Sequence, residues 1–186
     1  MKLNFKPVIL IMTLYLIATG ANASLLVNGG FENGLTGWNC TFFTAGSGNC
    51  GTDSFGGPQE GSSHFIGFDN GPGGLNSQSF ATDIGSTYEL SFWYGSSSTV
   101  NNLSVAIGDY SEAFTFDTDG SWEYISTTFT ATDTLSSLQF SFDTDPGTGT
   151  LWLDDVSVSA VPEPASLALL SLGLAGVGLA RRRKAA

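Results

Sequence analysis

The chain offers few side chains for covalent catalysis. Its single histidine, His64, lies in an alternating segment between Ser63 and Phe65. Nucleophilic catalysis pairs a serine or cysteine with a general base. A lone histidine in a strand more often has a structural role than a catalytic one. Glycoside hydrolysis needs only two placed carboxylates, but no motif selects a pair here. The residue types favour a protein that is not an enzyme, with a small secreted glycoside hydrolase as an alternative.

Three aromatic residues are the candidates for a binding surface. Trp93, Trp122 and Tyr124 lie at the opposite strand parity from the apolar residues of their segments. Successive side chains of a strand point to opposite faces, so these rings are expected on an outer face. Aromatic faces beside polar groups suit sugars, which predicts glycan binding. The alternative is that both sheet faces are partly covered and the rings only pack.

Cys40 and Cys50 are the only cysteines. In an exported chain two such cysteines are expected to form one disulfide. A metal site at this pair is disfavoured because no histidine lies nearby.

Short alternating segments separated by Gly, Asp, Asn and Ser recur about every ten residues. This spacing predicts an all-β fold, an antiparallel β-sandwich of jelly-roll type. Alternate apolar residues, such as Leu90, Phe92 and Tyr94, supply its inner faces. The expected strands are Leu25–Asn28, Trp38–Thr44, His64–Asp69, Gln78–Thr82, Tyr88–Tyr94, Leu103–Asp109, Glu112–Asp117, Trp122–Thr130, Leu138–Asp143 and Leu151–Val158.

The charges are sorted along the chain. All six Lys and Arg residues lie at the two ends, and all seventeen carboxylates lie between them. A domain without Lys or Arg repels phosphates, which excludes nucleic acid as a partner. Anionic polysaccharide is also repelled unless calcium bridges the two, whereas a neutral glycan meets no such penalty.

Residues 1–23 have the order of a secretory signal peptide. A short basic region is followed by an apolar stretch from Val8 to Ala18 and by Ala21-Asn22-Ala23, an A-x-A cleavage site. Cleavage after Ala23 is expected, and residues 24–160 then form one domain of ordinary size.

Residues 161–186 form a tail in three parts. Pro162-Glu163-Pro164 comes first, then the uncharged run 165–180, then the basic cluster Arg181, Arg182, Arg183 and Lys184. The run makes about 24 Å of helix, slightly short of a bilayer core, and is expected to span it with help from snorkelling arginines. The basic cluster predicts a cytoplasmic C-terminus.

This tail strongly resembles the PEP-CTERM sorting signals of bacterial exported proteins. The resemblance implies that an exosortase-type membrane enzyme recognises the tail and cleaves near the Pro-Glu-Pro triplet. The bacterial inner membrane is then a transient partner, and the mature protein ends at the cell surface or outside the cell. The alternative is an ordinary C-terminal anchor that is never cut.

The ends of the domain resemble a second family. Leu25-Leu26-Val27-Asn28-Gly29-Gly30-Phe31-Glu32 and Leu151-Trp152-Leu153-Asp154-Asp155-Val156-Ser157-Val158 resemble the first and last strands of carbohydrate-binding modules with a galactose-binding-like jelly roll. If so, the two terminal strands meet in one sheet.

Such modules often hold a structural Ca²⁺ near the chain ends. Asn28, Glu32 and Asp154 could supply oxygen ligands of the kind that calcium needs. Asp154 shares the strand parity of Val156 and Val158, which points it inward, although a bulge would exchange its phase with that of Asp155. The alternative is that both aspartates are solvated at a strand end.

Together these features predict an exported surface or matrix protein with a non-catalytic, glycan-binding jelly roll, whose partner is extracellular polysaccharide. A structural or adhesive surface protein without sugar specificity is the first alternative. Calcium-dependent stability without glycan binding would be its signature.

Overall fold

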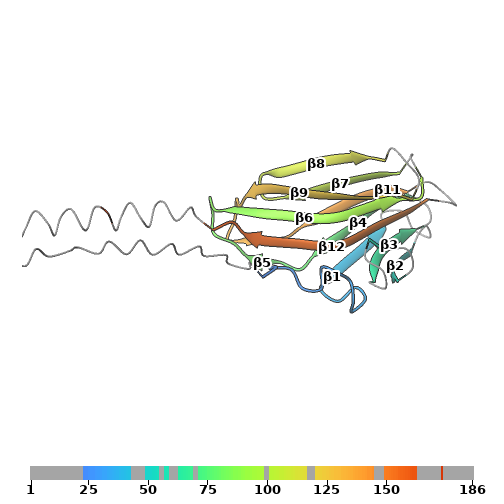
Figure 1. Ribbon diagram of the computed structural model, residues 1–186, viewed down its shortest axis with the longest axis horizontal. Helices are drawn as coiled ribbons and strands as arrows, with labels where there is room; N and C mark the ends of the chain where they lie inside the picture. The colour runs from blue at the N-terminus through green and yellow to red at the C-terminus, as the bar shows by residue number, and fades with distance from the viewer. Residues whose placement is uncertain are drawn as a thin grey trace, which may run out of the picture.

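The computed structural model describes residues 23–42, 49–54, 57–58, 63–68, 71–98, 101–116, 120–144, 149–162 and 173. This part of the chain forms the predicted antiparallel β-sandwich (Figure 1). Its strands are β1 (Trp38–Phe42), β2 (Asn49–Asp53), β3 (His64–Phe68), β4 (Gly71–Ser77), β5 (Phe80–Ala81), β6 (Thr87–Ser96), β7 (Asn102–Ile107), β8 (Tyr110–Thr115), β9 (Trp122–Thr130), β10 (Leu135–Ser136), β11 (Gln139–Thr144) and β12 (Thr150–Ala160).

The signal segment and the helix expected over 165–180 lie outside the described residues, Ala23 and Gly173 excepted. Within the described residues, no helix has both the length and the apolar character that crossing a membrane requires.

Two five-stranded sheets make up the sandwich. The first sheet has the strand order β1-β4-β11-β7-β8, and the second sheet has the order β2-β3-β12-β6-β9. The two-residue strands β5 and β10 pair separately. All pairings are antiparallel. Because the first and second sheets pack face to face, each has one face toward the core and one outer face.

The core fills the space between the inner faces. In β6 the predicted alternation is confirmed, because Leu90, Phe92 and Tyr94 are buried. Phe92 meets Phe140 of the first sheet at 5.2 Å and Phe114 at 5.9 Å between ring centroids. Burying such a side chain stabilises the fold by roughly 1.5 to 3 kcal/mol, so these rings hold the two layers together.

The two chain ends meet on β12, as the sequence predicts. The backbone N–H of Leu25 donates to Val158 O at 2.7 Å, and the N–H of Val156 donates to Gly29 O at 3.0 Å. The strand expected over 25–28 is nevertheless wrong. The segment bends because Asn28 takes a φ of 56°, which interrupts extended backbone. A Cβ at Gly29 would overlap Val156 O, so this approach requires glycine.

A β-bulge in β12 decides where its carboxylates lie. The register shifts between Asp154 and Ser157, and Asp155 takes a φ of 46°. The bulge keeps the leucines and valines of β12 on the core side. Asp154 therefore lies on the outer-face phase, yet its side chain is fully buried. The expected burial of Asp154 is confirmed, and so is the bulge that the sequence allowed, which separates the phase of Asp154 from that of Val156. The alternative, a solvated Asp154 at a strand end, is wrong.

The disulfide between Cys40 and Cys50 is confirmed. The sequence predicts a crosslink, but the structure adds that it joins β1, the edge of the first sheet, to β2, the edge of the second sheet. The crosslink thus closes one side of the sandwich.

The opposite side of the sandwich is closed by β8 and β9. Asp109 accepts a hydrogen bond from the N–H of Thr130 at 2.6 Å through Oδ1, and this bond lowers the pKa of Asp109. The Tyr110 hydroxyl donates to Glu112. Burial, followed by that carboxylate, raises the pKa of Tyr110 to about 12.

Three strands of the structure were not predicted from the sequence. β4 has the sequence Gly-Pro-Gly-Gly-Leu-Asn-Ser, which is typical of a turn. β2 is short and mostly polar, and β10 has only two residues. β4 is a strand because β1 and β11 both pair with it. The strand expected over 78–82 is reduced to β5.

Candidate functional site

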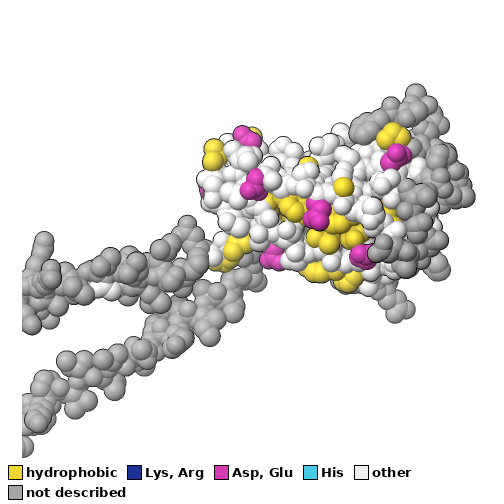
Figure 2. All heavy atoms as spheres, turned by 90° about the horizontal axis from the view of Figure 1, so that it is seen from above, with side chains coloured by type: hydrophobic (Ala, Val, Ile, Leu, Met, Phe, Trp, Pro, Cys, Tyr) yellow, Lys and Arg dark blue, Asp and Glu magenta, His cyan; other side chains and the backbone are white. Residues whose placement is uncertain are grey.

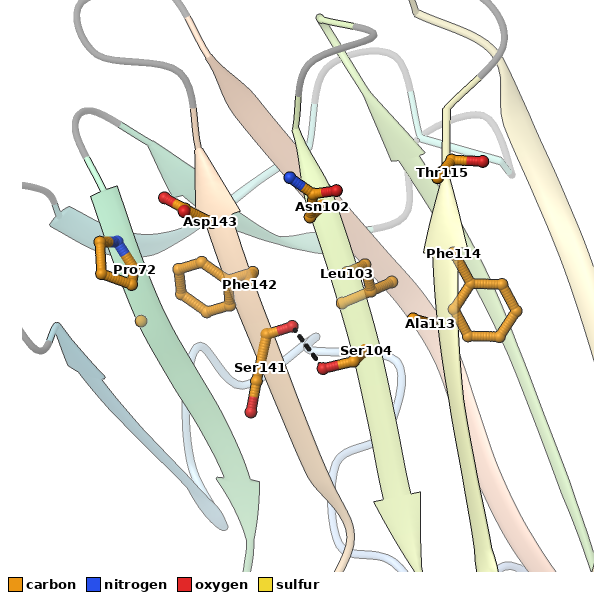
Figure 3. Close-up of a pocket in the computed structure, with 11 residues that line it drawn as sticks. Pro72, Asn102, Leu103, Ser104, Ala113, Phe114, Thr115, Ser141, Phe142 and Asp143 are labelled. Atoms are coloured by element: carbon orange, nitrogen blue, oxygen red, sulfur yellow. Dashed lines mark hydrogen bonds between the residues drawn. The ribbon is translucent and has the colours of Figure 1, made fainter.

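The outer face of the first sheet carries a shallow groove of about 300 Å³. It runs across β4, β11, β7 and β8 and is open to solvent along one side (Figure 3). Its surface residues are small or polar, since bulky side chains of these strands point to the core. The lining residues are Pro72, Gly73, Asn102, Leu103, Ser104, Ala113, Phe114, Thr115, Ser141, Phe142 and Asp143.

Strand register sorts the groove into rows. Asp143 lies opposite Pro72 on one side and Asn102 on the other, and Asn102 lies opposite Thr115. Figure 3 shows this row crossing the four strands. All four residues are exposed. The row presents a carboxylate, an amide and a hydroxyl along one line.

The next row is the low part of the groove. Ser141 pairs with Ser104, which pairs with Ala113. The Ser104 hydroxyl donates to the backbone oxygen of Ser141 at 3.4 Å, drawn as a dashed line in Figure 3. Small side chains here let a ligand approach the backbone of the sheet.

A third row adds amides beyond the groove. Asn76 on β4 lies opposite both Asn39 and Gln139. Each amide has a donor end and an acceptor end, and adjacent strands lie about 4.8 Å apart. A ligand in the groove would therefore meet further hydrogen-bonding groups along this edge.

In the described part of the chain, no Lys or Arg lies around the groove. All Lys and Arg residues of the sequence fall outside the described residues. On the face shown in Figure 2, every charged side chain that is coloured is a carboxylate. Among the groove residues, Asp143 alone is acidic. The described lining therefore lacks the second carboxylate that glycoside hydrolysis needs.

The three predicted aromatic residues lie together on the outer face of the second sheet. Trp93 of β6 pairs with Tyr124 of β9, and their ring centroids are 5.1 Å apart. Tyr124 is 52% exposed, whereas Trp93 and Trp122 are half-buried. The rings pack on one another and face solvent in part, which leaves open the alternative that they only pack. Glycan binding by them stays a prediction.

Trp122 has neighbours that its sequence position does not reveal. Its ring lies 5.9 Å from Trp152 and 5.3 Å from His64, edge to face in the second case. Register places Gly95 between the two tryptophans. A Cβ on Gly95 would lie 2.8 Å from the backbone oxygen of Ser121 and 3.1 Å from Trp152 Cε3. The glycine therefore leaves room for the Trp152 ring and for the Ser121 backbone.

His64 belongs to this cluster. The side chain is 1% exposed, and Nδ1 has no hydrogen-bond partner among the described residues. Burial lowers the pKa of His64, and the nearby Asp53 carboxylate opposes that shift in part. A neutral, packed histidine fits these surroundings.

The three predicted calcium ligands lie near the chain ends. The Asn28 amide is used inside its loop: Nδ2 donates to Gly34 O at 2.8 Å, and Oδ1 accepts from the N–H of Asn33 at 3.0 Å. Glu32 Oε1 accepts from the N–H of Ser63 at 2.8 Å.

Asp154 is enclosed beside the same loop. Its Oδ1 lies 4.0 Å from where a Cβ on Gly30 would sit and accepts from the N–H of Asp155 at 2.7 Å. Among the described residues, no three His, Cys, Asp or Glu side chains gather as a metal site would require. Calcium binding at these residues therefore stays a prediction.

The sorting tail starts directly at the end of the sandwich. The N–H of Val161 donates to Thr87 O at 3.1 Å, and Pro162 is exposed. The rest of the predicted motif, namely Glu163, Pro164, Arg181, Arg182 and Arg183, lies outside the described residues.

Sequence reasoning missed the groove. Its polar residues alternate with apolar ones on β7 and β11, which is the ordinary pattern of a half-exposed strand. One signal was present, since Asn102, Ser104 and Ala106 on β7 are all small or polar. Nothing in the sequence showed that β4 would lie in the same sheet as β7, separated from it by β11 alone.

Comparisons with known proteins agree with this fold. The module TmCBM61, solved in complex with β-1,4-galactotriose, aligns with a TM-score of 0.60 at 14% identity, over 75% of this chain and 99% of that chain. A putative sugar binding protein from Bacteroides thetaiotaomicron gives 0.58 at 12% identity, over 75% and 100%. The cyclase Fisc from Fischerella sp. TAU gives 0.53 at 17% identity, over 77% and 100%. Such identities show a shared fold alone.

Two family models match the sequence, while no curated protein does. The model described as a PEP-CTERM protein-sorting motif matches residues 160–184. The model described as a carbohydrate binding domain matches residues 23–149, which is more than half of the chain. The chain therefore belongs to the carbohydrate-binding domain family and carries a PEP-CTERM sorting motif behind that domain.

Proposed function

We propose that this is an exported, non-catalytic surface protein whose sandwich binds a glycan in the groove of the first sheet. The observation that carries the proposal is the groove itself, in a domain of a carbohydrate-binding family. Its hydroxyl, amide and carboxylate groups lie in registered rows, as the hydroxyls of successive sugar units would require. A few placed polar groups of this kind fix ligand orientation.

The ligand is a neutral glycan. Asp143 lines the groove, and the whole chain has a formal net charge of −11. An anionic polymer would be repelled, whereas Asp143 can accept hydrogen bonds from sugar hydroxyls. Hydrogen bonds to a charged acceptor contribute about 1.5 to 3 kcal/mol each.

The PEP-CTERM motif indicates an exported protein sorted to the cell envelope. In our proposal the tail tethers the protein briefly to the inner membrane until an exosortase-type enzyme processes it. The sandwich then works outside the membrane, with extracellular polysaccharide as its partner.

A structural Ca²⁺ between the N-terminal loop and β12 is part of the proposal. Asp154 is a fully buried carboxylate in a stretch without Lys or Arg, and burying a charge is costly unless it is compensated. Asp154 and Glu32 would supply oxygens, and the ion would lock the loop to the last strand. We expect a chelator to lower the melting temperature, and no change in melting would remove calcium from the proposal.

The test of glycan binding is calorimetry with neutral hexasaccharides. Replacing both Asn102 and Asp143 by alanine removes two exposed hydrogen-bonding groups without touching the core. Affinity should fall by about 10-fold to 100-fold, which corresponds to about 1.4 to 2.7 kcal/mol. Leu135→Ala is the control, because that side chain is 64% exposed and lies outside the groove. Equal affinity in all three proteins would refute the groove, and no binding to any neutral glycan would refute the function.

A further inference from the structure

The outer face of the second sheet is organised in layers. The ring pair Trp93 and Tyr124 forms one cross-strand row. Beside it, Trp152, Gly95 and Trp122 form another row. The two rows together make an aromatic ledge across β12, β6 and β9, and its most exposed ring is Tyr124, 52% exposed.

The rows on the other side of the ring pair are polar. Ser91 of β6 lies opposite Ser126 of β9 and Ser157 of β12. The Ser126 hydroxyl donates to Glu89 Oε1 at 2.7 Å, and Glu89 occupies the row after that. Residues two apart on a strand are about 7 Å apart. An apolar surface thus borders a hydroxyl row at the spacing of about one sugar ring.

This layering matches the chemistry of a sugar. A pyranose ring has a face of C–H groups, which packs on an aromatic ring, and an edge of hydroxyls, which needs donors and acceptors. The ledge supplies the first, and the serine row with Glu89 supplies the second. Half-exposed Trp and Tyr side chains are suited to a surface that is apolar on one side and wet on the other.

A second copy of the chain fits this face poorly. A symmetric contact places the same patch on both partners, so the exposed Glu89 would approach its own equivalent. The described residues hold no Lys or Arg to balance them. Like charges across an interface cost several kcal/mol. A neutral glycan carries no such charge.

We propose that this aromatic face is a second glycan-binding surface, so that one domain holds two neutral glycan chains on opposite sides of the sandwich. The groove lies on the outer face of the first sheet and the ledge on the outer face of the second, with the core between them. Neither surface hinders the other. A domain with two surfaces links chains in a matrix, and linked binding strengthens attachment without new contacts. The inference rests on the proposed function only in taking a glycan as the ligand.

Tryptophan fluorescence distinguishes the two surfaces because the groove lining contains no tryptophan. The probes are hexasaccharides of β-linked galactan, glucan, mannan and xylan, titrated into the full chain in a detergent without a sugar headgroup. We expect a saturable fluorescence change in the wild type. It should persist when Asn102 and Asp143 are both alanine, because that variant alters the groove alone.

The aromatic variant should behave in the opposite way. Replacing Trp93 and Tyr124 by alanine should raise the concentration for half-maximal change at least ten-fold, while calorimetry still detects the groove. Tyr124→Ala alone is the second variant should the double change impair folding, and it should show a smaller loss. Leu135→Ala should match the wild type. Beads coated with the bound polysaccharide should clump with wild-type protein and not with either double variant.

Three results overturn the inference. A flat fluorescence titration beside clear calorimetric binding leaves the groove as the single surface and the proposed function intact. Clumping that survives in the aromatic variant, or that follows a dimer in light scattering, removes bridging by one domain. Absence of all glycan binding removes the proposed function and this inference together.

Discussion

The disulfide is the crosslink whose contribution can be worked out most directly. Cys40 and Cys50 are separated by 10 positions, and closing a loop of that length in the unfolded chain stabilises the fold by about 2.7 kcal/mol. Both side chains are half-buried against the core, so alanine at both positions keeps apolar atoms there. For a domain of roughly 140 residues, that loss lowers the melting temperature by about 9 °C.

The position of the crosslink adds a regional expectation. It joins the edge strands β1 and β2 of different sheets, while β6 and β12 are central. In the double alanine variant, amide hydrogen exchange should rise first in residues 38–42 and 49–53. Exchange in β6 and β12 should change only as global stability does.

The assay is thermal unfolding with and without a reductant. Reduced wild type should melt within a few degrees of the double alanine variant, and the variant should ignore the reductant. If the variant melts within about 2 °C of the oxidised wild type, the crosslink does not stabilise the fold by this amount. Faster exchange confined to β8 and β9 would contradict the regional expectation, because the crosslink does not touch that side.

Three further predictions follow from single contacts. Gly29→Ala should lower the free energy of unfolding in urea by at least about 2 kcal/mol, because the added Cβ overlaps the carbonyl oxygen of Val156 in β12. Gly30→Ala is the control: its added Cβ has its nearest contact at 3.5 Å, so the free energy of unfolding should change by less than about 0.5 kcal/mol. Equal effects of the two substitutions would contradict the close approach at Gly29. Tyr110 has a pKa raised to about 12 in the folded state, so between pH 10 and 12 the folded protein keeps a proton that the unfolded chain has lost. The free energy of unfolding should therefore fall as the pH rises through this window, and Tyr110→Phe should remove the contribution of Tyr110 to that fall. An ultraviolet titration of Tyr110 with a midpoint near pH 10 would contradict the raised pKa. A six-residue Gly-Ser insertion between Val161 and Pro162 should speed the conversion of the uncleaved precursor to the processed form, followed on immunoblots. The reason is that Val161 is hydrogen-bonded to the sheet, which holds the triplet close to the folded domain. An unchanged rate of conversion would show that the folded sheet does not hinder processing.

Periodicity was enough to predict the sandwich because buried strands leave a period-two pattern. β6, β7 and β11 all have buried apolar residues at alternate positions, and those residues build the core. β4 could not be predicted in this way. Its glycines and proline are turn residues by local preference, and only pairing with β1 and β11 makes them a strand.

The candidate site was predictable in part. Strand parity was sufficient to place Trp93, Trp122 and Tyr124 on one outer face, because parity is a local property. The groove depends on which strands become neighbours, and that is decided by the whole fold. The orientation of Asp154 was predictable only in part, because the sequence allowed a bulge in this strand but did not show where it would lie.

Binding of a neutral glycan on the outer face of the first sheet can be measured directly by the change in backbone amide NMR shifts as the bound hexasaccharide is added. We expect the largest saturable changes from the first sheet to fall on Asn102, Ser104, Ser141 and Asp143. Binding that leaves these four amides unmoved would contradict this expectation.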